Sequence, residues 1–256
     1  MNGTVEVGWA FGGLLLLLVL IAAAVVRLGG IGGWLPVVTA AARAIAQLGA
    51  VSLVIVVVLR SGWLTAVFVL LMFGIAALTS AKRISDLRRG LLAAAAIVAG
   101  VTPILALLLA TGLVPLAPVA VLPIAGILIG GAMTATSLAG RRALDELTAR
   151  HGEYEAALAL GLGRRDAALL IVRPTANQAL VPAIDQTRTV GLVTLPGTFV
   201  GVLLGGGTPV EAGATQLLVL IALLAIEAVA VLVTVELVAS RPTCRSPGRS
   251  PRTGSP

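Results

Sequence analysis

Cysteine, histidine and charge are scarce in this chain of 256 residues, which contains one cysteine, one histidine and 11% charged residues. The single cysteine, Cys244, excludes an intrachain disulfide framework and a thiolate cluster. The single histidine, His151, has no second histidine or cysteine near it in the sequence, so a zinc or haem site has no set of ligands. The pattern G-x-x-x-x-G-K-S/T is absent, so the chain has no Walker A loop to bind ATP. We therefore expect no catalytic residue, no cofactor and no enzymatic activity in this chain, and we assign no metal ligand.

Apolar residues dominate what is present. At 58% hydrophobic residues, the composition is too apolar for a soluble protein and is typical of a polytopic membrane protein. A helix needs about 20 apolar residues to cross the hydrocarbon of a bilayer. The sequence thus predicts an all-α transmembrane bundle of about seven spans, at residues 9–26, 36–59, 63–80, 91–110, 115–138, 187–206 and 213–239.

The basic residues predict the orientation of these spans. If the N-terminus lies outside, all of the 18 lysines and arginines except Arg60 fall on the inner side. Cytoplasmic loops of membrane proteins are enriched in these residues. We therefore expect the N-terminus outside and the C-terminus inside, in a multi-pass protein of a bacterial inner membrane. These loops account for the net charge of +7, which does not indicate a nucleic-acid partner.

The composition divides the chain into a membrane domain and a tail. Residues 1–239 form the predicted transmembrane domain, and residues 139–182 within it form a predicted cytoplasmic coupling region. Residues 240–256 lack apolar residues to bury and are rich in Pro, Ser, Gly and Arg, so we expect a disordered basic tail. Its arginines could touch anionic lipid headgroups, or the tail could simply be solvated. Cys244 lies in this tail and is assigned no role.

One long charged interval, residues 141–174, interrupts the apolar sequence. Within it, Glu155, Ala156 and Ala157 are followed by three residues, then by Gly161, and after nine more residues by I-V-R-P. This spacing resembles the EAA loop of ABC-transporter permeases, the segment through which the permease contacts its ATPase subunit.

The same residues suggest a mechanical role. The alanines form a slim, strongly helical segment that can enter a groove on a partner, and Glu155 supplies a charge for a basic partner residue. Gly161 and Gly163 let the chain turn out of the helix, since glycine tolerates positive φ. Such a lever could pass a rigid-body movement of the partner to the transmembrane helices. The alternative is an ordinary amphipathic linker helix with accidental spacing.

The sixth predicted span contains a proline and a row of glycines. Gly197, Gly201 and Gly205 recur every four residues, a pattern that lets two membrane helices approach closely. Pro196 would remove a helical hydrogen bond in mid-membrane, so a broken helix there could act as a hinge or expose carbonyl groups to a substrate. We interpret Pro196 and Gly197 first as packing and hinge residues, with direct coordination as the alternative.

Four polar residues lie within or beside the predicted spans. Glu227 falls near the middle of the seventh span, where a charge costs about 2.5 to 3.5 kcal/mol on insertion scales, so we expect it to face the interior. It could pair with another helix, be protonated, or form a cation or proton site. Gln47, Asp185 and Arg188 are predicted near inner mouths, where they could tie helices together or line a path.

Further stretches are similar to the FetB or YbbM type of ABC-transporter permease, which includes bacterial iron exporters and plant aluminium-tolerance proteins. The matching runs keep their order along the chain: RAIAQL at 43–48, AKR at 81–83, LPIAGILIGGAM at 122–133, ALALG at 157–161, ALVPAIDQTRTVGLVTLPG at 179–197 and TPVEAGATQ at 208–216. Two departures concern the cargo. The family commonly has methionines where this chain has Thr198 and Phe199, and asparagine where it has Gly131. Because thioether ligands suit some transition metals, this chain need not handle the same ion.

The resemblance implies an integral membrane permease subunit that pairs with a second copy of itself and with two copies of a separate ATPase. That ATPase would bind ATP and Mg²⁺, and the pair would export a metal ion, with iron as one candidate. A secondary transporter or channel that uses Glu227 as a proton or cation site is the alternative. A scaffold or sensor that docks a cytoplasmic partner and transports nothing is a third reading. Neither the ion nor the direction of transport follows from the residues.

Overall fold

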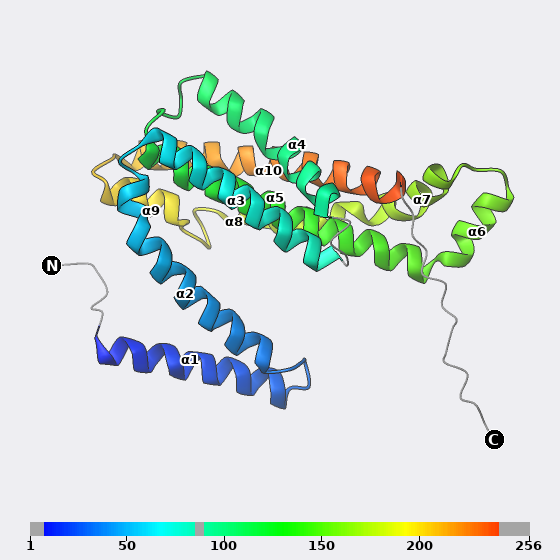
Figure 1. Cartoon of the computed structure of the whole chain (residues 1–256), viewed down its shortest axis with the longest axis horizontal. Helices are drawn as coiled ribbons and strands as arrows, with labels where there is room; N and C mark the ends of the chain where they lie inside the picture. The colour runs from blue at the N-terminus through cyan, green and yellow to red at the C-terminus, as the bar shows by residue number, and fades with distance from the viewer. Residues whose placement is uncertain (1–7, 85–89, 241–256) are drawn as a thin grey trace. The chain divides into compact units, whose positions relative to one another are not determined.

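The computed structural model describes residues 8–84 and 90–240 (Figure 1). Within these ranges the chain is helical and contains no β-strand, and seven helices are long and apolar enough to cross a membrane. This confirms the predicted all-α transmembrane bundle. The predicted tail lies outside the described residues, apart from Ser240. The helices form two compact units, residues 1–61 and residues 62–256.

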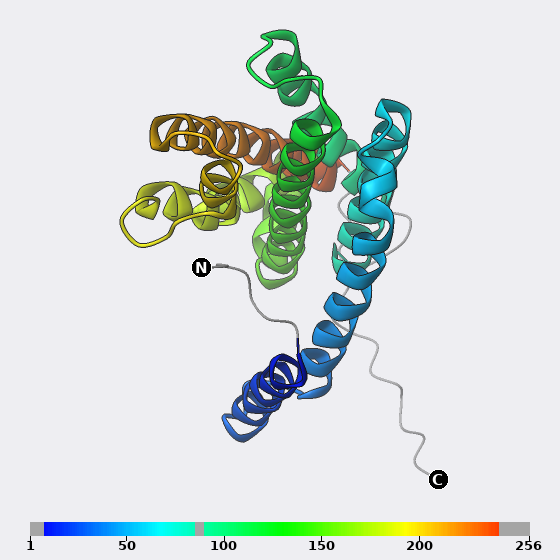
Figure 2. The same ribbon diagram turned by 90° about the vertical axis from the view of Figure 1, so that its left-hand side faces the viewer.

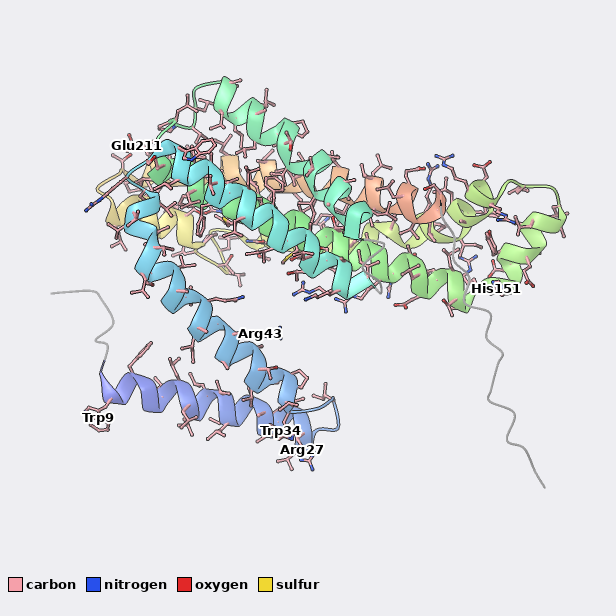
Figure 3. The ribbon with its side chains drawn as sticks, in the orientation of Figure 1. Trp9, Arg27, Trp34, Arg43, His151 and Glu211 are labelled. Carbon is pink, nitrogen blue, oxygen red and sulfur yellow. The ribbon has the colours of Figure 1, made fainter. Side chains whose placement is uncertain are left out.

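The first unit contains α1 (Trp9–Leu28) and α2 (Leu35–Val58). Trp9 and Trp34 lie at opposite ends of α1 (Figure 3), where tryptophan suits the two membrane–water interfaces. Most apolar side chains of both helices are exposed, so only lipid or another protein surface can cover them. Gln47 lies near the middle of α2; its predicted place at an inner mouth stays a prediction.

Four long helices form the framework of the second unit: α3 (Gly62–Ile84), α4 (Gly90–Ala110), α5 (Pro118–Ala149) and α10 (Pro209–Ser240). α5 packs against the other three, and α4 also packs against α3 and α10. Seen end-on, α5 lies between α3 on one side and α10 with the α8–α9 segment on the other (Figure 2). α5 and α10 are also the two long helices against which the short helices described below pack.

Small residues set the distance between these helices. Ala125 and Ala132 of α5 are fully buried among Ile, Leu and Val side chains of the neighbouring helices. Ser80 of α3 and Ser137 of α5 form a hydrogen bond between their Oγ atoms at 3.0 Å. Helices in lipid associate through such close packing and hydrogen bonds, because the hydrophobic effect does not act between them.

The length of α5 and α10 determines where the polar part of the chain lies. Each has 32 residues, so each is about 48 Å long. The hydrocarbon of a bilayer is only about 30 Å thick, so each helix extends beyond it by several turns. α5 continues to Ala149, past the end of the predicted span at residue 138. Its last turns carry the first charged residues of the polar interval, which explains why these turns were not counted as part of an apolar span.

Five short helices connect α5 to α10: α6 (His151–Ala159), α7 (Arg164–Val172), the 3-10 helix η2 (Arg173–Ala179), α8 (Val181–Thr189) and α9 (Gly197–Leu204). The predicted continuous span at 187–206 is wrong, because residues 190–196 leave the helix between α8 and α9. Judged by length and composition alone, the sixth candidate span is Arg164–Thr189.

The break has local causes in the sequence. Gly191 has a φ of 82°, a conformation that few other residues adopt, and its N–H donates to the carbonyl of Thr194 at 2.9 Å. Pro196 follows directly with extended backbone and precedes the first residue of α9. The prediction of a broken helix at Pro196 is thus confirmed in position, although the break is a seven-residue turn and not a kink.

α10 begins with a capping box. The backbone N–H and the hydroxyl of Thr208 donate to Glu211 Oε2 at 2.8 and 2.9 Å, and the Glu211 N–H donates to Thr208 Oγ1 at 3.3 Å. Glu211 marks one end of the second unit, and His151 at the start of α6 marks the opposite end (Figure 3). α10 therefore runs from the turn that follows α9 toward the end of the unit at which α5 ends.

Gly100 of α4 tests the close packing directly. A Cβ at Gly100 would lie 2.8 Å from the backbone carbonyl oxygen of Ile226 on α10, which cannot move aside, whereas Gly74 of α3 has nothing within 4 Å. We predict that Gly100→Val lowers the free energy of unfolding by about 1–3 kcal/mol and that Gly74→Val changes it little. Thermal unfolding in detergent measures both. Equal midpoints for the two variants would show that α4 does not pack on α10 in this way.

Candidate coupling and translocation site

The predicted coupling residues lie on a short hairpin made of α6 and α7. Glu155 and Ala156 are exposed on α6, while Ala157 faces inward and is buried. The Glu155 side chain is 67% exposed, and its Oε1 lies 3.1 Å from His151 Nε2 one turn earlier. Glu155 therefore remains accessible to a partner, whereas Ala157 holds the helix onto the rest of the unit.

Gly161 ends α6 in a Schellman motif. The Gly161 N–H donates to the carbonyl of Leu158 at 3.0 Å, and the Leu162 N–H donates to that of Ala157 at 3.1 Å. Gly161 has a φ of 92°, which explains why glycine stands at this position of the motif. Gly163 has an ordinary extended conformation before α7 and does not need glycine for its backbone angles.

The end of the hairpin presents apolar side chains to solvent. Leu160 is 83% exposed and Leu162 is partly exposed, on either side of the Gly161 turn. No other described residue covers Leu160, and exposed leucines next to a charged helix are typical of a protein contact. The hairpin thus combines an exposed carboxylate at Glu155 with an apolar end.

α7 is the inner arm of the hairpin and is held by packing. Ala167, Ala168, Ile171 and Val172 are almost completely buried in one cluster with side chains of α5 and α10. Arg150 at the end of α5 adds a long hydrogen bond of 3.5 Å from Nη1 to the carbonyl of Ile171. A displacement of α7 would therefore have to move α5, α10 or both.

Glu236 of α10 joins two arginines at the base of the hairpin. Arg165 of α7 donates from Nη2 to Glu236 Oε2, and Arg173 of η2 donates from Nη2 to Glu236 Oε1 at 2.6 Å. The Glu236 side chain is only one-quarter exposed, so the pair is less screened by water than a surface ion pair. We call this arrangement the Glu236 clamp; it ties α7 and η2 to α10.

A second ion pair lies at the start of α6. Arg150 donates from Nε and Nη2 to the two carboxylate oxygens of Glu153, at 2.8 and 2.5 Å. The hydrogen bond from Arg150 lowers the pKa of the Glu153 carboxyl below its ordinary value. Because this pair is exposed to water, it orders the junction of α5 and α6 and contributes little to stability.

Glu227 lies halfway along α10 and lines a cavity of about 290 Å³. The residue is 7% exposed, and no described residue forms a hydrogen bond or ion pair with its carboxylate. The polar residues beside it in the cavity wall are Thr134 of α5 and Gln186 of α8. The prediction that Glu227 faces the interior is confirmed, whereas a pairing with a charged group on another helix is not found among the described residues.

A larger cavity of about 730 Å³ lies toward the end of the unit that carries α9. The two cavities share Ile127, Gln186 and Leu223 in their walls, so they meet at these residues. The larger cavity is mainly apolar; Gln216 is one of its lining residues, and the buried Oε1 atom of Gln216 has no hydrogen-bond partner among the described residues. The two cavities are thus neighbours, one toward the α9 end and the other beside Glu227.

The structure brings some of the predicted path residues together. Pro196 and Gly197 line the larger cavity, and Glu227 lines the smaller one. Asp185 and Arg188 are exposed on α8, with Nη1 and Oδ1 4.0 Å apart, and lie outside both cavities. α8 lies beside Glu227, because Pro182, Ala183 and Gln186 line the same cavity, so the two charges are near the level of Glu227. Their predicted place at an inner mouth stays a prediction.

The glycine row of α9 does not pack within the chain. A Cβ at Gly197 or Gly201 would meet nothing within 4 Å, so the predicted close approach to another helix has no partner among the described residues. Gly126 and Gly131 of α5 are different. Gly126 contacts the end of Met72, and a Cβ at Gly131 would collide with Leu223 and lie 2.8 Å from Glu227 Oε1. Gly131 therefore makes room for the Glu227 side chain.

Sequence reasoning missed several residues of this site. Gln186, Thr134, Arg165 and Arg173 carry no recognisable spacing, because each meets its neighbours only in the folded chain. Gly131 was noted only as a departure from the related sequences. That difference could have predicted a close contact, because a glycine in a tightly packed helix leaves space that a neighbouring side chain fills.

These features define a multi-pass helical membrane protein with a polar hairpin at one end and a cavity that a buried carboxylate lines. The chain belongs to the Uncharacterised protein family (UPF0014), whose family model matches residues 10–242. The resemblance found in the sequence is thereby confirmed. No solved structure matches this chain at a significant level.

Three relatives illustrate the family. The chain is 35% identical to the UPF0014 membrane protein STAR2 of Oryza sativa subsp. japonica over 71% of this chain and 65% of the relative. It is 35% identical to the Protein ALUMINUM SENSITIVE 3 of Arabidopsis thaliana over 63% of this chain and 59% of the relative. It is also 35% identical to the Probable iron export permease protein FetB of Escherichia coli strain K12, over 49% and 48%. The chain thus spans less than two thirds of the length of these curated relatives.

The Glu236 clamp leads to a prediction about stability. Glu236→Gln removes the negative charge that both arginines share, so we expect the free energy of unfolding to fall by about 1 kcal/mol at low salt. The control is Asp145→Asn, which removes an exposed carboxylate of α5 that forms no ion pair among the described residues. Thermal unfolding in detergent at low and high NaCl separates the two variants. Equal midpoints, or a difference that high salt does not reduce, would contradict the clamp.

Proposed function

We propose that this chain is the membrane-spanning permease subunit of an ABC transporter, powered by ATP that a separate subunit binds with Mg²⁺ and hydrolyses. The observation that carries the proposal is the α6–α7 hairpin, which exposes Glu155 and Leu160 at one end and is buried between α5 and α10 at the other. Such a hairpin can receive a push from a partner and pass it to membrane helices. The chain itself has no Walker A loop, so the energy would come from the partner.

The Glu236 clamp offers a route from the hairpin to the cavity of Glu227. Arg165 and Arg173 hold Glu236, and Glu227 lies nine residues earlier on the same helix, about 14 Å away along the axis. A helix moves as a rigid rod over this distance, so a shift of α7 would displace the wall of the cavity. This movement would open the cavity to alternate sides, with the α8–α9 turn at Pro196 and Gly197 as the hinge.

A second copy of the chain completes the proposal. Asp185 and Arg188 are exposed at the height of Glu227, and charged side chains at this depth face a protein interior or water and not lipid. The unpacked glycines Gly197 and Gly201 lie on the next helix, where they can accept a closely packed helix. We therefore place the contact of a homodimer, or a water-filled path between two copies, along α8 and α9.

For the cargo we propose a metal ion that is exported, with iron as one candidate. The support is the similarity to the protein named as an iron export permease and to the protein named for sensitivity to aluminium. In the part of the chain that the structure describes, no group of three His, Cys, Asp or Glu residues could hold a metal tightly. A transporter benefits from a weak site, because the ion must leave again.

Substitutions in the hairpin test the coupling. We predict that Glu155→Lys and Gly161→Leu reduce ATP-dependent flux at least tenfold in proteoliposomes that contain the chain and its copurified ATPase, while membrane insertion is unchanged. Glu155→Lys reverses the exposed charge, and Gly161→Leu strains the turn at φ 92°. Asp145→Lys on α5 is the charge-reversal control, and Gly161→Asn is the turn control because asparagine tolerates positive φ.

Two results would overturn the proposal. The first is cargo-stimulated ATP hydrolysis at the wild-type level in both hairpin variants. The second is full transport by the purified chain alone, driven by a proton gradient without any ATPase. That second result would support a secondary transporter or channel, which the unpaired Glu227 in its cavity also fits. Stable association with the ATPase but no transport of any cation would support a scaffold.

A further inference from the structure

We propose that Glu227, together with Thr134 and Gln186, forms a binding site for an oxygen-preferring metal cation in the middle of the membrane domain. This inference rests on the proposed transport function and names both the place and the class of the cargo. It starts from a carboxylate that is 7% exposed, lines a cavity and has no hydrogen-bond or ion-pair partner among the described residues. A buried carboxylate without a partner is costly unless a ligand supplies the opposite charge.

The donors around Glu227 determine the class of cation. The cavity wall supplies a carboxylate from Glu227, an amide from Gln186 and a hydroxyl from Thr134, and contains no sulfur or imidazole group. The Thr134 hydroxyl donates to the carbonyl of Gly130 at 3.0 Å, which leaves its oxygen lone pairs free to accept a cation. Oxygen ligands of this kind suit Mg²⁺, Ca²⁺ and Mn²⁺, whereas soft ions such as Cu⁺ prefer thiolates and thioethers.

Gly131 makes the carboxylate available. Its missing side chain leaves the space that Glu227 Oε1 occupies, since a Cβ there would lie 2.8 Å from this oxygen. Gly130 precedes it in the same cavity wall, but a Cβ at Gly130 would meet nothing within 4 Å. Of the two glycines, therefore, only Gly131 lies against the carboxylate of Glu227, the proposed metal ligand.

A second cavity adjoins the proposed site. Gln186 lines both cavities, so the larger cavity at the α9 end and the cavity of Glu227 lie on either side of this residue. The larger cavity is about 730 Å³, enough for a cation with part of its hydration shell. The nearest charged groups on α8, Asp185 and Arg188, pair with each other outside the cavity, so within the described residues Glu227 is the only charge in the cavity walls.

Mn²⁺ binding to the purified full-length chain tests this site without the ATPase and without transport. Electron paramagnetic resonance measures free Mn²⁺ in a titration of the protein in detergent. We expect wild-type protein to bind Mn²⁺, Mg²⁺ to displace it, and Cu⁺ not to displace it. Glu227→Gln is expected to weaken binding at least tenfold. A neutral amide is less costly than a carboxylate at this depth, so this variant should insert and fold at least as well as the wild type.

The glycine pair provides the matched control. Gly131→Ala should weaken Mn²⁺ binding several-fold because the added methyl displaces Leu223 and Glu227, which both line the cavity, whereas Gly130→Ala should bind like the wild type. No Mn²⁺ binding by the wild type, unchanged binding by Glu227→Gln, or tighter binding of Cu⁺ than of Mn²⁺ would each overturn the proposal. Because the assay contains no ATP and no partner, Glu227-dependent binding without ATP-dependent flux would refute the permease function and leave the site standing.

Discussion

The packing of α5 against α10 is the interaction on which the rest of the second unit depends. Both helices are about 48 Å long, roughly half as long again as the hydrocarbon of a bilayer is thick. Their central turns can therefore build a membrane core, while their last turns extend beyond it and hold α7. One pair of helices thus carries both the cavity of Glu227 and the base of the α6–α7 hairpin.

Small residues allow the helices of the second unit to pack closely. Small residues with open space around them show where a helix has no packing partner among the described residues. Gly100, Gly131 and Gly140 contact atoms of other helices so closely that no side chain would fit without movement. Gly197 and Gly201, four residues apart on α9, have open space around them instead. The first three glycines therefore form helix contacts within one chain, whereas Gly197 and Gly201 leave room for a helix of another chain. The same residue type therefore has different meanings, which only the surrounding atoms distinguish.

The break between α8 and α9 leaves backbone groups outside a helix. In a membrane, backbone groups outside a helix need partners, and a turn is tolerated where protein or water surrounds it. Residues 190–196 meet part of this need with the Gly191–Thr194 hydrogen bond, next to a cavity lined by Pro196 and Gly197. The charges of Asp185 and Arg188 lie just before the turn. The segment thus joins charged residues on α8 to the exposed apolar side chains Leu192, Val193 and Leu195 of the turn.

The sequence by itself determined the membrane class, five of the seven apolar helices within several residues at both ends, the start of α5, the turn at Gly161 and the inward position of Glu227. Each of these follows from local composition, backbone preference or the cost of a charge in hydrocarbon, which act over a few turns of one helix. Only the tertiary structure decided the clamp of Arg165 and Arg173 on Glu236 and the contact of Gly131 with Glu227. These depend on residues that lie about 60 to 100 positions apart in the chain, and helix packing alone brings them together.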